Sequence, residues 1–243
     1  MDDEILPGDK RDFLSQTVMF GVLGDQEPDS EDRIAIDRTF ETFAKVVVID
    51  REWIGTKAVE EGGTAVLEKY AGLWLAPGDP CAGSEAFVAA AEYARRNGIP
   101  LLATGFGFRH VVEEFAKNVL HAAVSPFSGD PDIFPSPKPA TVNIRRDTLA
   151  SLLYDADQSE ETATCGYAMD PAFREGLEGT DLVISGVDER GMAMIAEHAD
   201  RKFYVGTVFS PHPANDPAEL PPILHGFIRK GCMLHLRRFL DSL

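Results

Sequence analysis

Short apolar runs that alternate with amphipathic helical segments are the feature that most restricts how this chain can fold. The strand-like runs are residues 17–24, 45–50, 71–78 and 99–104. Helical periodicity marks residues 31–44, 85–98 and 108–120. Strands that alternate with helices in this way form parallel sheets covered by helices on both faces. The sequence therefore predicts an α/β protein with a mostly parallel open sheet and helices on both of its faces.

The second half of the chain has a different character. Residues 121–140 contain five prolines and are predicted to form an irregular, proline-rich excursion. Further strands are predicted at residues 140–144, 162–169 and 202–209, with a hairpin over residues 181–199. A last helix is predicted from about Ala218 or Pro221 to Asp241. We expect residues 1–243 to form one domain, with residues 1–16 as a polar leader.

Composition excludes several classes of function. The net charge of −17 would repel nucleic acid and anionic lipid, so we expect neither a nucleic-acid partner nor a membrane partner. The three cysteines have no paired or metal-like spacing, and we expect no disulfide, metal site or cofactor. The first ten residues are acidic where a secretory signal would be basic and then apolar, so a cytoplasmic protein is expected.

The stretch "LLATGFGFRHVVEEFAKNVL", residues 101–120, predicts a strand, a sharp turn and a helix. Ligands of open α/β sheets gather beyond the carboxyl ends of the strands, where this turn falls. Enzymes place nucleophiles at such strained elbows, but Gly105 has no side chain. Glycine relieves the strain of a positive φ, and Gly107 would permit a ligand to approach the backbone. The turn therefore predicts a binding site without an obvious nucleophile.

Three blocks, in order, carry a family resemblance. They read "AGLWLAPGDP", "AFVAAAEYARRNGIPLLATGFGFRHVVEEFAKNVL" and "RKFYVGTVFSPHPAN", and "TCGYAMDPAF" adds to them. From about Val18 to the last helix, the chain resembles the class I glutamine amidotransferase domain of CTP synthase. It is still more similar to the stand-alone family related to the C-terminal region of that enzyme. The resemblance implies a flavodoxin-like layered α/β fold and a place in pyrimidine nucleotide metabolism.

The chain departs from the family at the catalytic positions. By the resemblance, the nucleophilic cysteine of the family falls on Gly105, its histidine on Ser210 and its glutamate on His212. Amidotransfer needs a thiolate, an imidazole that takes the thiol proton, and a carboxylate that orients the imidazole. With all three replaced, ordinary glutaminase chemistry is not expected. The resemblance then implies a small-molecule-binding or regulatory module.

Other residues offer weaker routes to catalysis. Cys81 lies where the family builds its oxyanion hole and precedes a predicted helix, a position that lowers a thiol pKa. Cys165 lies in a predicted strand, and either cysteine is an alternative nucleophile or a packing residue. Cys232 is expected to pack in the core. Ser210 and His212 suggest a serine–histidine pair, although no third orienting group is evident.

Eight residues form the predicted ligand site. They are Pro77, Gly78, Gly105, Gly107, Arg109, His110, Ser210 and His212. Arg109 would receive an anionic group at the helix N-terminus, where the helix dipole favours negative charge, or would remain solvated. His110, in the first turn, would contact a ligand or face solvent.

Three functions stay open on the sequence. The first is a binding or regulatory module for a small molecule, with a glutamine-like compound as one candidate ligand. The second is an enzyme of altered chemistry, such as an amidase, a hydrolase or a glutaminase with a relocated cysteine. The third alternative is an accessory subunit of a separate synthase, because 243 residues leave no room for an ATP-dependent amido-ligase domain. A homo-oligomer also remains open.

Overall fold

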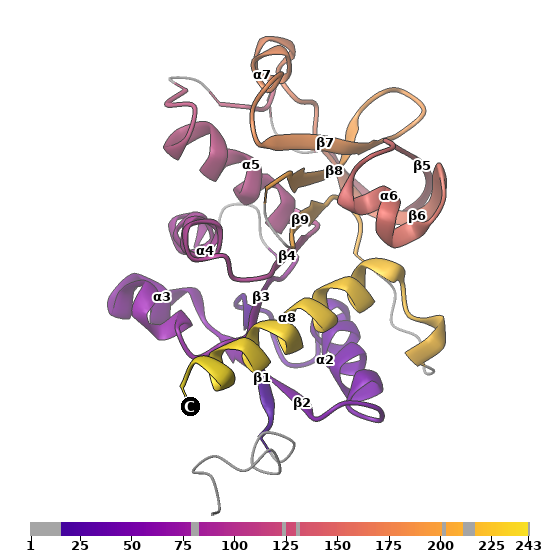
Figure 1. Ribbon diagram of the computed structural model, residues 1–243. Coiled ribbons are helices and arrows are strands. Elements are labelled where there is room, and N and C mark those ends of the chain that lie inside the picture. Colours follow the sequence, from indigo (N-terminus) through magenta and orange to yellow (C-terminus); the bar gives the residue numbers. More distant parts are fainter. Residues whose placement is uncertain are drawn as a thin grey trace, which may run out of the picture.

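The computed structural model describes residues 16–78, 83–122, 125–129, 132–200, 203–210 and 217–242. Over these ranges the strands join in one nine-stranded sheet with the order β2-β1-β3-β4-β9-β8-β7-β5-β6 (Figure 1). Helices cover the sheet, so the predicted α/β class is confirmed. None of the helices in these ranges is long and apolar enough to cross a membrane.

One half of the sheet is parallel. Its strands are β2 (Ile49–Ile54), β1 (Val18–Leu23), β3 (Gly72–Leu75), β4 (Leu101–Thr104) and β9 (Tyr204–Thr207). Each pairs in parallel with its neighbour in this order. The strands β3, β4 and β9 are fully buried, which explains their continuous apolar sequences. Their carboxyl ends meet at one edge of the sheet, where the predicted site falls.

The other half of the sheet is antiparallel. Its strands are β8 (Ala193–His198), β7 (Leu182–Val187), β5 (Asp132–Ile144) and β6 (Gln158–Gly166). The predicted hairpin is confirmed as β7 and β8. The predicted irregular excursion is wrong from residue 132 onward, because β5 pairs with β6 there. A register shift between Ile133 and Lys138 interrupts the pairing where prolines, which lack an N–H donor, are concentrated.

Helices pack on both faces of the sheet. The helices are α2 (Glu31–Phe43), α3 (Thr56–Gly62), α4 (Ser84–Asn97), α5 (Phe106–Asn118), α6 (Leu149–Tyr154), α7 (Pro171–Gly176) and α8 (Pro222–Asp241). Short 3₁₀ turns occupy Gly63–Leu67 and Pro217–Glu219. The short helices α3, α6 and α7 were not predicted, since six or seven residues carry too little periodicity.

An aromatic cluster holds α2 and α8 against one face of the parallel strands. The rings of Phe20 and Phe40 lie 5.6 Å apart, and Phe40 lies 6.0 Å from Trp74. Phe227 of α8 contacts both Phe20, at 5.2 Å, and Trp74, at 6.1 Å. Tilted and edge-on contacts at these distances add to the energy of burial itself. A second apolar cluster, which includes Phe87, packs α3 and α4 against the sheet.

The strand predicted over residues 45–50 is misplaced. The structure begins β2 at Ile49, and Val46 and Val48 are 65% and 55% exposed. The amides of Val46 and Val47 donate to the Phe43 carbonyl, so this part of the chain completes the end of α2. Strand pairing with β1 starts only afterward, at Ile49. Three adjacent valines are therefore left at the surface.

Candidate functional site

The predicted elbow is present between β4 and α5. Gly105 has φ of 56° and ψ of −120°, and α5 begins at the next residue. L-residues rarely adopt this conformation, so glycine suits the turn. Just before it, the Trp74 indole N–H donates to the Thr104 hydroxyl at 3.0 Å and holds the end of β4. The chain therefore has the backbone of a nucleophile elbow without a side chain at its apex.

Three predicted site residues come together at this turn. A Cβ built on Gly105 would lie 2.9 Å from the Pro77 Cβ and 3.9 Å from the Ser210 Oγ. Pro77 follows β3 and Ser210 follows β9, so the ends of three neighbouring strands supply these groups. The Ser210 hydroxyl is buried and has no hydrogen-bond partner among the described residues. Its hydrogen-bonding capacity is therefore unsatisfied within the described part of the chain.

Gln26 lies beside the candidate site, although the sequence analysis did not include it. A Cβ built on Gly78, another predicted site residue, would lie 3.1 Å from the Gln26 Nε2. Both polar atoms of the Gln26 amide are buried, with no partner in the described part of the chain. The neighbouring Asp25 carboxylate accepts from the Thr56 amide at 2.9 Å and from its hydroxyl at 2.5 Å, which fixes this loop. Gln26 could have been predicted from its position shortly after β1, at the edge of the sheet where the parallel strands have their carboxyl ends.

Gly107 serves packing. A Cβ at this position would lie 2.7 Å from the Leu75 carbonyl oxygen. Helix α5 therefore approaches the backbone of β3 at a distance that only glycine permits. The close approach predicted for a ligand is made here by the protein's own strand.

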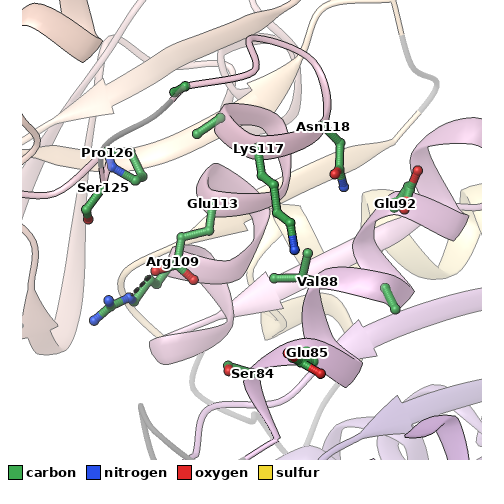
Figure 2. Close-up of a pocket in the computed structure, with 13 residues that line it drawn as sticks. Ser84, Glu85, Val88, Glu92, Arg109, Glu113, Lys117, Asn118, Ser125 and Pro126 are labelled. Atoms are coloured by element: carbon green, nitrogen blue, oxygen red, sulfur yellow. Dashed lines mark hydrogen bonds and ion pairs between the residues drawn. The ribbon is translucent and has the colours of Figure 1, made fainter.

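Arg109 lines a cavity of about 710 Å³ between α4 and α5. Figure 2 shows Arg109 joined to Glu113, with Ser84 and Glu85 at the start of α4. The Arg109 Nε lies 2.6 Å from a Glu113 carboxylate oxygen, and its guanidinium lies over the Phe127 ring at 5.9 Å. The residues that line this cavity do not include the elbow residues. Arg109 is therefore neither fully solvated nor at the elbow itself.

His110 lies inside the α4–α5 packing. Its ring is 2% exposed and stacks on Phe87 of α4, with ring centroids 5.0 Å apart. Its Nδ1 lies 3.2 Å from the second carboxylate oxygen of Glu113. The solvent-facing position considered for His110 is therefore wrong, and its contact with a ligand stays a prediction.

Lowering the pH is expected to weaken the α4–α5 region through Glu113. Burial alone would raise the pKa of Glu113, but hydrogen bonds from His110 and Arg109 outweigh burial and hold it below its ordinary value. A depressed carboxyl pKa stabilises the fold above the unfolded-state value of about 4.3, and this contribution is lost as the pH falls through the folded-state value. Urea unfolding at pH 7 and pH 3 should show a smaller difference in Glu113→Gln than in the wild type. An equal difference would contradict this role of Glu113.

Of the two alternative nucleophiles, the structure describes Cys165 but not Cys81. Cys165 is 1% exposed, and its thiol lies 3.8 Å from the Val208 carbonyl. A thiol enclosed in this way is a packing residue in the present conformation. Cys81 and His212 lie outside the described residues. Cys232, expected in the core, is only partly buried on α8.

Comparisons with known proteins agree with this geometry. The chain is 30% identical to CTP synthase of Pyrococcus furiosus, over 89% of this chain and 45% of that enzyme. It is 32% identical to CTP synthase of Pyrococcus horikoshii, over 73% of this chain and 37% of that enzyme. The chain thus spans about half the length of the curated relatives it matches or less. No family model matches it.

Solved structures show the same fold. The glutaminase domain of Trypanosoma brucei CTP synthase, solved with bound acivicin, superposes with a TM-score of 0.76 at 20% identity, over 89% of this chain and 94% of that one. A glutamine amidotransferase of Thermotoga maritima superposes with a TM-score of 0.52 at 12% identity, over 93% of this chain and 99% of that one. With the sequence relatives and the elbow, these likenesses lead to one assignment. The chain belongs to the class I glutamine amidotransferase-like family and is related to the glutaminase domain of CTP synthase.

Proposed function

We propose that this protein binds a small molecule at the elbow and does not hydrolyse glutamine, acting as a binding or regulatory relative of the amidotransferases. The conformation of Gly105 carries this proposal. The elbow backbone is present, but a Cβ at its apex would lie 2.9 Å from the Pro77 Cβ. Position 105 therefore carries no nucleophilic group, and Pro77 occupies the space that a side chain there would need.

The neighbouring groups support binding better than proton transfer. Ser210, which takes the family's histidine position by the resemblance, offers a hydroxyl that cannot serve as a base near neutral pH. The unpartnered Ser210 hydroxyl and Gln26 amide can both donate and accept hydrogen bonds. Backbone amides at the start of α5 favour a negative group on the ligand. These groups suit a small polar ligand with amide and carboxylate groups, of which glutamine is the simplest candidate.

Purified protein is expected to release no ammonia from glutamine above background. Loss of a triad lowers turnover by roughly 10⁶-fold in a well-studied protease, so the residual rate should be undetectable. The measurement follows ammonia and glutamate beside a Cys81→Ala, Cys165→Ala double variant. Release that vanishes in the double variant would establish a relocated thiol and overturn the proposal.

Binding is tested separately from hydrolysis. Glutamine at 100 times its dissociation constant would stabilise the fold by about 2.7 kcal/mol. Thermal unfolding with and without glutamine should show this shift in the wild type and a smaller shift in Ser210→Val and in Gln26→Ala. Absence of any shift with glutamine and related amides and carboxylates would remove the ligand part of the proposal.

A synthase partner is the second candidate function. The supporting observation concerns the relatives, because the region that matches this chain makes up only 45% and 37% of two longer CTP synthases. By analogy, this protein would associate with a synthase, and both would act in pyrimidine nucleotide metabolism in the cytoplasm. Size-exclusion chromatography with a purified candidate synthase should show co-elution, and separate elution of each tested chain would count against this role.

A further inference from the structure

An apolar groove lies along α2 and α8. Val46 and Val47, which the sequence had assigned to a strand, form part of it. Its volume is about 420 Å³, and its lining residues are Phe43, Val46, Val47, His225, Ile228, Arg229, Cys232, Met233 and Leu236. The Phe43 and His225 rings meet edge to face at 5.1 Å, which joins the two helices at its base. Met233 and Val46, at its rim, are 54% and 65% exposed. Such a concentration of exposed apolar side chains indicates a surface that another segment covers.

One basic residue lines the groove, and others lie beside it on α8. Arg229 lines the groove, whereas Lys230 and Arg237 line a neighbouring hollow on α8 that shares Met233 with the groove. None of the ion pairs found among the described residues involves Arg229 or Lys230, and Arg237 reaches Asp241 only at 3.8 Å. A segment that fits this surface would combine apolar side chains with acidic ones.

Residues 1–15 have this chemistry. They lie outside the described structure, and their sequence "MDDEILPGDKRDFLS" contains five acidic and two basic residues, with apolar pairs at Ile5–Leu6 and Phe13–Leu14. The segment also leads directly into β1, which begins close to the groove. The Val18 amide donates to the Val48 carbonyl at 3.0 Å, so the chain enters the sheet beside the exposed valines. Phe13, five residues before Val18, is at most about 17 Å along an extended chain from this point.

We propose that the segment of residues 1–15 docks in the α2–α8 groove, with Phe13 and Leu14 covering its apolar floor and its aspartates facing Arg229 and the adjacent Lys230. A second copy of the chain fits less well. A two-fold contact over this groove would bring Arg229 and Lys230 of the two copies near one another, which costs energy. The tether also favours the chain's own segment, because its effective concentration at the groove far exceeds that of another molecule.

Cys232 in the groove reports whether the segment covers it. Burial raises the pKa of the Cys232 thiol, so labelling is compared at one fixed pH. All proteins carry Cys81→Ala, and Cys165 is enclosed, so labelling reports on Cys232. Deletion of residues 2–14 should accelerate labelling roughly tenfold, because no local opening then precedes the reaction. Addition of a synthetic peptide of residues 1–15 should slow it again.

Two aspartate substitutions at adjacent positions distinguish loss of docking from a general disturbance of the fold. Leu14→Asp should accelerate labelling, whereas Ser15→Asp adds the same charge one residue away and should not. Equal labelling of the wild type, the deletion and Leu14→Asp would overturn the proposal. Wild-type labelling that slows with protein concentration, together with a dimer in sedimentation, would assign the groove to a second copy and overturn it as well.

Discussion

Replacing Glu114 by alanine is expected to lower the free energy of unfolding by about 3–5 kcal/mol, the range for a buried ion pair that loses one partner. Glu114 on α5 is fully buried, and its carboxylate meets the Arg95 guanidinium of α4 at 2.6 and 2.9 Å. Asn118 also donates to it, at 3.3 Å. The substitution would leave the Arg95 charge, mostly shielded from water, without its main partner. Urea unfolding at pH 7 measures the change.

The matched control is Glu92→Ala, which removes a carboxylate from α4 itself. Glu92 pairs with Arg96 at 3.0 Å, but the Arg96 side chain is largely exposed. Exposed pairs of this spacing contribute only about 0.3–0.5 kcal/mol, so this variant should unfold nearly as the wild type does. An Arg95→Ala, Glu114→Ala double variant should lose less than the sum of the two single changes. Similar losses for Glu92→Ala and Glu114→Ala would show that burial does not set the energy of the Arg95 pair.

The fold could be predicted because its strongest signals are local. The strands β3 and β4 are buried on both faces, so their sequences are continuously apolar and bounded by turn residues. The error over residues 45–50 has the same origin. Val46, Val47 and Val48 have the composition of a buried strand, but the hydrogen bonds at the end of α2 and the register of β1 decide where β2 begins. The strand propensity of the valines carries no information on how β2 pairs with β1.

The candidate site was predictable to the extent that it depends on strand ends. Pro77, Gly105 and Ser210 each follow a parallel strand, and parallel strands bring their carboxyl ends to one edge. The same reasoning applied to β1 would have found Gln26. His110 could not be placed in this way, because its burial depends on Phe87, which comes from another helix.

Replacing Gly107 by alanine is expected to destabilise the protein by about 3 kcal/mol, the upper end for overpacking a tight interior contact. Alanine is the better helix former by about 1 kcal/mol, so local preference alone would make this change stabilising within α5. The opposing effect is steric. The new Cβ would lie 2.7 Å from the Leu75 carbonyl oxygen, a backbone atom of a central strand that cannot rotate away.

Gly176→Ala separates the steric effect from the general consequences of losing a glycine. Gly176 ends α7, and a Cβ there would meet nothing within 4 Å. This variant should be neutral or gain about 0.4–1 kcal/mol through a less flexible unfolded chain. Urea unfolding of both variants measures the contrast. If Gly107→Ala proved as stable as Gly176→Ala, α5 would not depend on its contact with β3, and Gly107 would again be open to the ligand role predicted from the sequence.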